Sequence, residues 1–203
     1  VTSVELSQRR AMGTLLRCRE KENLEIIVGN LNDIEFSKKY DYITLIGVLE
    51  YQGRFTNSDN PYRDFLTKIK QLLKPDGKLL IAIENQYGLK YWCGAGEDHT
   101  GVPFDGMNQY IYTNQGIRTF SKGGLKKLVN ESGFSDTFFY YPLPDYKLST
   151  VVYSEKYLPQ NENLQNTSFY YAPNRMSLLA NEKNIYKDII EISNNKILED
   201  EEL

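Results

Sequence analysis

The chain has 203 residues, of which 40% are hydrophobic and 25% charged, and its 24 Lys and Arg against 27 Asp and Glu give a formal net charge of −3. This is the composition of an ordinary soluble globular protein, and it excludes the overall basic field typical of proteins that bind nucleic acid or anionic membranes. The length suits one α/β domain with an appendage.

Cysteine content and the pattern of apolar residues predict a cytoplasmic protein without nucleic-acid or membrane partners. Cys18 and Cys93 have no metal-type spacing and define no disulfide framework. No stretch reaches the ~20 apolar residues of a membrane span, and residues 1–20 lack the order of a signal peptide. The chain begins on Val1, without Met, and reads like a fragment of a longer protein.

Two short apolar runs with a helix between them open the chain. Residues 1–5 form a β-branched run, Ser7 is a suitable N-cap for a helix reaching to about residue 20, and residues 24–28 form the next strand. Glu5 ends the first of these strands. A carboxylate at such a position can accept both ribose hydroxyls of a nucleotide, and a solvent-exposed loop carboxylate is the alternative.

The most regular part of the sequence is residues 40–85. An almost unbroken apolar run at 43–49 precedes a helix that starts at Pro61 behind Asn60, and a Lys-Pro-Asp-Gly turn at 74–77 leads to a second apolar run at 79–83. Runs of this kind are typical of parallel strands that are covered on both faces. The segment therefore predicts a βαβ unit.

Residues 41–51 (DYITLIGVLEY) and 73–84 (LKPDGKLLIAIE) resemble the fourth strand, fourth helix and fifth strand of class I S-adenosylmethionine-dependent methyltransferases. The resemblance implies a Rossmann-like, doubly wound, mostly parallel sheet with an antiparallel C-terminal strand pair, and S-adenosyl-L-methionine as cofactor. The chain would start at the family's second strand, so that the central first strand and its Gly-rich turn are missing. Another segment or a second copy could fill the slot, the flanking strands could pair directly, or the sheet could be arranged differently.

The resemblance also implies which residues hold the cofactor. Glu5 would bind the ribose, Asn30 stands where the family usually has an acidic residue for the adenine amino group, and the N–H of Leu31 would meet the ring. The backbone of Gly47 and Val48 would approach the methionine end.

Other readings of the loop residues near these positions stay open. Asp33 is a nearby substitute for Asn30. Glu50 lies close to the expected cofactor, and favourable electrostatics at a helix start is its alternative role.

Residues 85–117 form an over-long connection, which is typical of a lid at the active end of a sheet. This segment holds the only Trp and the only His, and Glu97 and Asp98 precede His99. We predict His99 or Asp98 as a general base that deprotonates a hydroxyl, and Tyr87, Trp92 and Arg118 as substrate-binding residues. An ordered loop histidine is the alternative. No metal site is predicted, because contiguous carboxylates beside one His do not converge on an ion.

The C-terminal part begins with a helix from Ser121 to Gly133, which is followed by strands at 137–141 and 148–153. These strands fit the antiparallel pair of the methyltransferase class. We therefore predict a domain over residues 1–157. Residues 158–203, with an aromatic triplet at 169–171 and a helix at 177–192, would form a helical appendage or begin a further module.

Three functions follow from these patterns. Residues 84–92, 97–101 and 118–121 are similar to a bacterial methyltransferase subgroup associated with glycosyltransferases of surface-polysaccharide assembly, which implies a small-molecule or glycan hydroxyl as acceptor. A non-catalytic interaction or regulatory module of methyltransferase fold is the alternative, favoured by the missing Gly-rich turn. A nucleotide-sugar or NAD enzyme is disfavoured because its phosphate-binding loop is not in this sequence.

Overall fold

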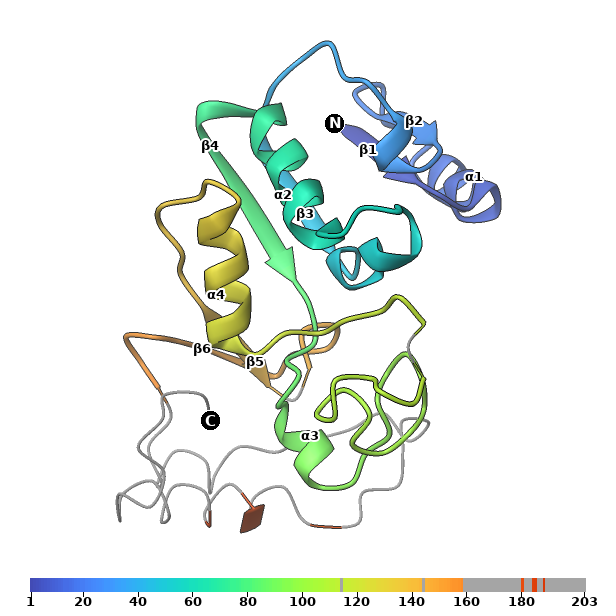
Figure 1. The fold of residues 1–203 in the computed structure, drawn as a ribbon. Helices are drawn as coiled ribbons and strands as arrows, with labels where there is room; N and C mark the ends of the chain where they lie inside the picture. Colours follow the sequence, from blue (N-terminus) through green and yellow to red (C-terminus); the bar gives the residue numbers. More distant parts are fainter. Residues whose placement is uncertain (114, 144, 159–179, 181–183, 186–187, 189–203) are drawn as a thin grey trace.

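The computed structural model describes residues 1–113, 115–143, 145–158, 180, 184–185 and 188 (Figure 1). The expected aromatic triplet at 169–171 lies outside these residues, as does almost all of the expected helix at 177–192. Among the residues that the structure describes, no helix combines the length and the apolar character that crossing a membrane requires.

The N-terminal unit is a parallel strand pair with a helix between its strands. Strand β1 (Thr2–Glu5) pairs with β2 (Glu25–Val28), and α1 (Gln8–Arg17) connects them. The hydroxyl oxygen of Ser7 accepts a hydrogen bond from the backbone N–H of Arg10, which confirms the predicted N-cap. The helix ends at Arg17, before the expected residue 20, because Cys18 leaves the helical conformation and its chain turns there.

The predicted βαβ unit is present. Strand β3 (Tyr40–Ile46) leads through the short helix η2 (Leu49–Arg54) to α2 (Pro61–Leu72), and β4 (Leu73–Ala82) returns parallel to β3. Pro61 occupies the first turn of α2, as expected.

The predicted turn at 74–77 is part of β4, where it forms a bulge. The pairing jumps from Tyr40–Leu73 to Tyr42–Lys78, so the intervening residues bow out of the ladder. Gly77 permits this close approach, because a Cβ at its position would lie 2.9 Å from the Tyr40 carbonyl oxygen. The strand therefore begins directly after α2.

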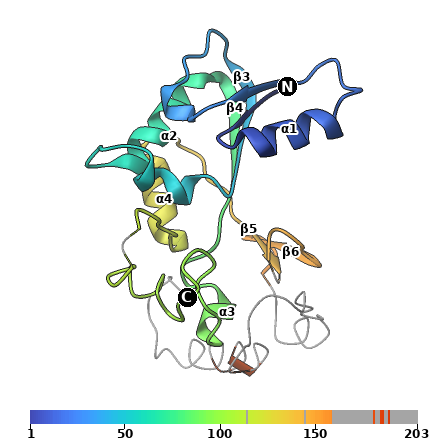
Figure 2. The same cartoon turned by 90° about the vertical axis from the view of Figure 1, so that its right-hand side faces the viewer.

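The main core lies between β3–β4 and the helices α2 and α4 (Lys122–Glu131). Figure 2 shows these two helices on one side of β3–β4 and α1 on the other. The fully or nearly fully buried side chains of this core are Leu45, Leu49, Phe65, Leu66, Ile69, Phe120 and Val129. The Ser121 hydroxyl caps α4 through the Gly124 N–H at 3.1 Å, as predicted.

The C-terminal strand pair is antiparallel, as expected. Strand β5 (Tyr140–Leu143) pairs with β6 (Val151–Ser154). Two short helices complete the description: η1 (Leu31–Asp33) follows β2, and α3 (Leu89–Trp92) lies in the long connection after β4.

The predicted fold class, a Rossmann-like α/β arrangement of parallel strands with an antiparallel C-terminal pair, is confirmed. Within the described ranges, however, the strands form three separate two-stranded sheets, β1–β2, β3–β4 and β5–β6. The strands expected to flank the missing first strand, β1 and β3, do not pair directly. The break falls between the two parallel pairs, where the resemblance places the missing strand.

Candidate functional site

The carboxyl ends of the parallel strands meet at one edge of the molecule. The side-chain amide of Asn32, just after β2, donates to Gln52 Oε1 in η2 at 3.1 Å, and η2 follows β3. The Lys68 ammonium in α2 donates to the carbonyl oxygens of Leu31 at 3.0 Å and Asn32 at 2.7 Å. Because β1 runs parallel to β2 and β4 parallel to β3, the segments after all four strands share this edge.

The long connection at 85–117, which we call the lid, lies at the same edge and is attached at both ends. Asn85 forms a β-bridge with Phe120, and the Gln86 N–H donates to the Phe120 carbonyl at 3.0 Å. On the return side, the Arg118 N–H donates to the Glu50 carbonyl at 2.9 Å. The two ends of the lid therefore lie side by side and against η2.

A close backbone approach adds to this attachment. A Cβ at Gly53 in η2 would lie 2.7 Å from the Gly116 carbonyl oxygen, and one at Gly116 would lie 2.8 Å from the Gly53 carbonyl oxygen. Gly116 also has a φ of +69°, a conformation that glycine adopts most readily. Glycine is therefore required on both sides of this contact.

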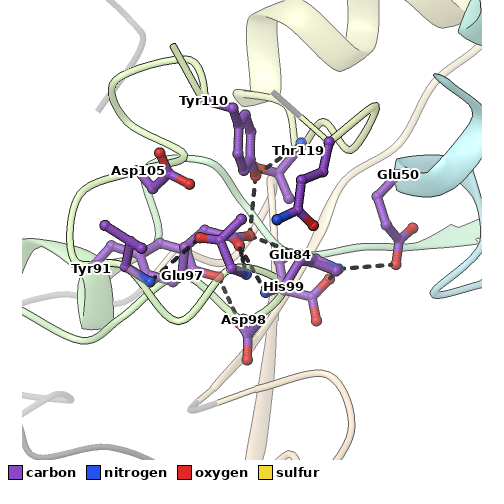
Figure 3. Close-up of polar contacts among 12 residues, drawn as sticks. Glu50, Glu84, Tyr91, Glu97, Asp98, His99, Asp105, Tyr110 and Thr119 are labelled. Atoms are coloured by element: carbon purple, nitrogen blue, oxygen red, sulfur yellow. Dashed lines mark hydrogen bonds and ion pairs between the residues drawn. The ribbon is translucent and has the colours of Figure 1, made fainter. Parts of the chain in front are cut away.

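The lid brings His99 between three carboxylates from different segments (Figure 3). His99 Nδ1 lies 2.7 Å from Glu97 Oε1, and Nε2 lies 3.6 Å from Glu50 Oε1 and 4.0 Å from Glu84 Oε2. The His99 side chain is only 5% exposed. The Tyr51 ring meets the imidazole edge-on, with ring centres 5.2 Å apart.

The carboxylates set the charge state of the imidazole. Burial lowers the pKa of His99, but the carboxylates of Glu50 and Glu97 outweigh burial and raise this pKa to about 9. For Glu97, burial acts in the opposite direction and raises the pKa. Its bonds with His99 and the backbone N–H of Thr100 outweigh burial, so the pKa of Glu97 lies below its usual value. The pair therefore favours an imidazolium held by a carboxylate.

Glu97 organises the lid around itself. Its Oε2 accepts hydrogen bonds from the backbone N–H groups of His99 at 2.7 Å and Thr100 at 2.9 Å, which closes a tight turn. Its Oε1 accepts from the Tyr110 hydroxyl at 3.1 Å, and that hydroxyl lies 2.7 Å from Thr119 Oγ1. A carboxylate at this position thus connects the turn, the histidine and the end of the lid.

Asp98 faces away from this cluster and has its own partners. Its carboxylate forms an ion pair with Lys90 and accepts a hydrogen bond from the Tyr91 hydroxyl at 2.6 Å. Burial raises the pKa of Asp98, but these two partners outweigh burial and lower it. Asp98 thus joins the lid turn to α3.

Glu84 lies two residues after the end of β4. It is buried and paired with a lysine. Its Oε1 forms an ion pair with Lys147 and lies 3.4 Å from the Tyr146 hydroxyl, which can donate to it. Burial lowers the pKa of Lys147, and the Glu84 carboxylate more than compensates and raises it. The loop between β5 and β6 therefore closes one side of the histidine cluster.

The expected cofactor residues are all at the strand ends. Glu5 Oε1 accepts from the Ser7 N–H at 2.8 Å and pairs with Arg10 at 2.7 Å, and chiefly the Arg10 bond lowers the pKa of Glu5. Asn30 caps η1 through the Asn32 N–H at 3.1 Å. Gly47 has a φ of +62° and donates its N–H to the Ala82 carbonyl at 2.9 Å.

Two further expected cofactor residues use their carbonyl groups locally. The Leu31 carbonyl is a partner of Lys68, and the Val48 carbonyl accepts from Gln52 Nε2 at 3.0 Å.

The expected substrate residues fall into two groups. Arg118 lines a cavity of about 220 Å³ together with Tyr62, Gln86 and Tyr110, and its guanidinium lies 5.3 Å from the ring centre of Phe120. Tyr87 and Trp92 lie elsewhere on the lid, where the Trp92 indole N–H donates to the Tyr87 carbonyl at 3.2 Å. The structure therefore does not bring all three into one cavity.

Sequence reasoning missed the part that Glu84 takes in this cluster and treated Glu50 only as a neighbour of the cofactor. Both are acidic residues close behind a buried strand, and the carboxyl ends of parallel strands converge. That signal could have paired them with His99.

Residues 1–81 match the family described as "Methyltransferase domain". The match confirms the resemblance seen in the sequence for this part of the chain, and with it S-adenosyl-L-methionine as the cofactor of the domain family. No curated protein matches the chain significantly.

Several solved methyltransferase structures are similar to the chain. Against the mycolic acid cyclopropane synthase CmaA1, the identity is 19%, the alignment covers 81% of this chain and 52% of that one, and the TM-score is 0.49. A S-adenosylmethionine-dependent methyltransferase from Clostridium acetobutylicum gives 12% identity, 70% and 64% coverage and a TM-score of 0.46. The CcbJ methyltransferase from Streptomyces caelestis gives 17% identity, coverage of 44% of this chain and 36% of that one, and a TM-score of 0.39. The chain thus spans about a third to two thirds of the length of these structures.

Proposed function

We propose that the chain belongs to a S-adenosylmethionine-dependent methyltransferase that methylates a hydroxyl group of a small molecule or glycan. The observation that carries the proposal is the convergence of the four parallel strand ends and the lid histidine at one edge, in a chain whose first 81 residues match a methyltransferase family. Ligands of open α/β sheets bind at this edge.

Glu5, Asn30, Leu31, Gly47 and Val48 form the cofactor cradle in this proposal. Glu5 Oε1 accepts from the Ser7 N–H and pairs with Arg10. In this proposal Glu5 Oε2 accepts the hydrogen bond of a ribose hydroxyl. Gly47 lets a ligand reach the backbone, since even a Cβ there would lie 3.2 Å from the Tyr146 hydroxyl. S-adenosylmethionine, when bound, supplies an electrophilic methyl group on its sulfonium, and the chain's part is to position an acceptor oxygen against it.

His99 is the proposed catalytic residue. Glu97 holds Nδ1, so Nε2 is the atom that faces the strand ends. Nε2 takes the acceptor proton only when the imidazole is neutral, and because the pKa of His99 is raised to about 9, the reaction should speed up toward alkaline pH. Asp98, the other base predicted from the sequence, is committed to Lys90 and Tyr91, and we propose that it positions the lid turn instead.

The acceptor is proposed to contact the lid. Arg118 offers a cation in the cavity of about 220 Å³, and Trp92, with 39% of its surface exposed, offers with Tyr87 an aromatic surface on which a sugar ring can pack. The similarity of the lid sequence to a bacterial subgroup associated with glycosyltransferases supports a glycan acceptor. The two cysteines, which lack the spacing of a disulfide framework, fit the proposed cytoplasmic location.

Calorimetric titration of the protein with S-adenosylhomocysteine tests the proposal. We expect micromolar binding that Glu5→Ala abolishes and that Glu25→Ala, a change at an exposed carboxylate at the other end of the β1–β2 pair, leaves unchanged. Methyl transfer to a panel of sugars and small alcohols should fall with His99→Asn while cofactor binding persists. Binding that is insensitive to Glu5→Ala would contradict the assigned cradle.

A second function is favoured by the break between β1–β2 and β3–β4. A domain with an interrupted sheet suits a non-catalytic module that keeps the fold for interaction. Absence of cofactor binding by the folded protein would decide for this module and against the enzyme.

A further inference from the structure

We propose that Glu50, Glu84 and His99 form a binding site for one divalent transition-metal ion. The inference goes beyond the proposed function and does not depend on it. Glu50 follows β3, Glu84 follows β4, and His99 lies in the lid. The site therefore exists only where these three segments meet. The sequence predicted no metal site because it considered only carboxylates adjacent to His99.

The spacing of the potential ligand atoms suits a single ion. One atom from each of the three residues lies within 4.8 Å of the others, with Nε2 at 3.6 Å from Glu50 Oε1 and 4.0 Å from Glu84 Oε2. Ligands bound at about 2.1 Å in a tetrahedral arrangement are about 3.4 Å apart. The cluster therefore needs movements of only a few tenths of an ångström to contact an ion at its centre.

Two buried carboxylate oxygens at this point have no hydrogen-bond donor. Glu50 Oε2 and Glu84 Oε2 are inaccessible to solvent and unpartnered among the described residues, and the two residues are 1% and 6% exposed. An imidazolium at His99 has one N–H for both glutamates, at distances longer than a hydrogen bond. Glu84 Oε2 is the unpartnered oxygen that lies near Nε2, and a cation shared with His99 would satisfy it, while Glu50 lies near Nε2 through Oε1.

The surroundings resemble the support that metal-bound histidines have. Glu97 Oε1 lies 2.7 Å from His99 Nδ1, so in the neutral imidazole it fixes the tautomer whose Nε2 lone pair points at the two glutamates. Lys147 and the Tyr146 hydroxyl both contact Glu84 through Oε1, which keeps Oε2 turned toward His99.

The charges around the site also suit a dication. Glu50, Glu84 and Glu97 contribute three negative charges around a neutral imidazole, and Lys147 contributes one positive charge in contact with them. Lys90 pairs with Asp98 and Asp145 and is not counted here, because among the described residues it forms no ion pair with these three glutamates. A net charge of −2 in a buried cluster matches one divalent ion.

The ligand types select the class of ion. One imidazole nitrogen and two carboxylates suit Zn²⁺, Mn²⁺ or Fe²⁺, whereas Mg²⁺ and Ca²⁺ prefer oxygen alone. The ion and a proton compete for the same nitrogen, so His99 can serve as a base only in the ion-free protein.

Metal titration of the chelator-treated 203-residue chain, without cofactor or acceptor, tests the inference. We expect calorimetry to show one Zn²⁺ or Mn²⁺ per chain and a clear preference over Mg²⁺. Glu50→Gln and Glu84→Gln should weaken binding by at least tenfold, and Glu97→Gln, which keeps all three ligands, by about 10 to 100-fold with the same stoichiometry. Glu25→Gln, at an exposed ion pair, is the matched control and should bind like wild type.

A measurement on the wild type alone guards against variants that do not fold. Co²⁺ should give the visible absorption of nitrogen and oxygen coordination, without the charge-transfer band of a thiolate. No uptake at millimolar concentration, a thiolate band that implicates Cys18 or Cys93, or unchanged affinity in folded Glu50→Gln and Glu84→Gln would each overturn the inference. Loss of methyl transfer with intact metal binding would count against the proposed function only.

Discussion

Replacement of Glu97 by Gln should destabilise the protein strongly although it changes only one side-chain atom. Glu97 is 1% exposed, and its carboxylate accepts from two backbone N–H groups and from the Tyr110 hydroxyl and contacts His99 Nδ1. Gln keeps one acceptor oxygen, which can retain the two backbone bonds. The new amide N–H groups then face the Tyr110 hydroxyl and His99 Nδ1, where an acceptor is needed.

The expected loss follows from these contacts. A hydrogen bond to a charged group contributes about 1.5–3 kcal/mol, and a broken buried ion pair costs about 3–5 kcal/mol. Some of the loss is recovered because His99 can become neutral once its carboxylate partner is gone. We therefore expect the free energy of unfolding to fall by about 2–4 kcal/mol.

Equilibrium unfolding in urea, with chelator present to keep metal out, measures this change. Trp92, the only tryptophan, reports on the lid by fluorescence, and far-UV circular dichroism reports on the whole fold. Glu25→Gln removes the same charge from an exposed pair with Lys38 and should leave the urea midpoint close to that of wild type. A similarly small change for Glu97→Gln would refute the view that this carboxylate organises the lid.

Three further predictions concern the frame of the site. Gly53→Ala places a Cβ 2.7 Å from the Gly116 carbonyl oxygen, so it should lower the free energy of unfolding by about 1–3 kcal/mol and speed proteolysis of the lid. Gly13→Ala, in open space on α1, should instead raise the free energy of unfolding by about 0.5–1 kcal/mol. Leu66→Ala empties a fully buried core position and should cost about 2–5 kcal/mol in urea unfolding with both signals lost together; separate transitions would contradict a shared core. Arg10→Met removes the main cause of the lowered pKa of Glu5, so NMR titration should show this pKa rising toward its usual value. In the wild type, ionised Glu5 stabilises the folded state above the usual pKa, and this contribution to the free energy of unfolding is lost as the pH falls through the lowered pKa. The variant should lack this pH-dependent loss.

Local signals in the sequence predicted the individual elements well. Ser7 and Ser121 cap the helices expected of them, and Pro61 opens α2, because capping depends on neighbours in the sequence. The Lys-Pro-Asp-Gly stretch at 74–77 was expected as a turn between helix and strand. It is a bulge within β4 instead, because Leu73 already pairs with Tyr40.

The arrangement of the site depends on contacts between distant segments, which a pattern along the chain does not contain. The sequence placed His99 in a lid at the ligand edge, and the structure places it there beside Glu50 and Glu84. It also proposed Asp98 as a base, without a way to foresee that Lys90 and Tyr91 fold back onto that carboxylate. Likewise, strand patterns predict pairing partners but not the break between β1–β2 and β3–β4.

The paired attachment of the lid at Asn85 and Phe120 makes it a replaceable cassette. Its entry and exit are joined by a bridge and held to η2 through the Gly53 and Gly116 contact, so the intervening loop can change in length or composition without moving the strands beneath it. A loop grafted between these two residues must therefore keep Glu97 and His99 if the histidine cluster is to form, whereas the rest of the loop can be exchanged. The parallel strands, with the proposed cofactor residues at their ends, would stay in place throughout such an exchange.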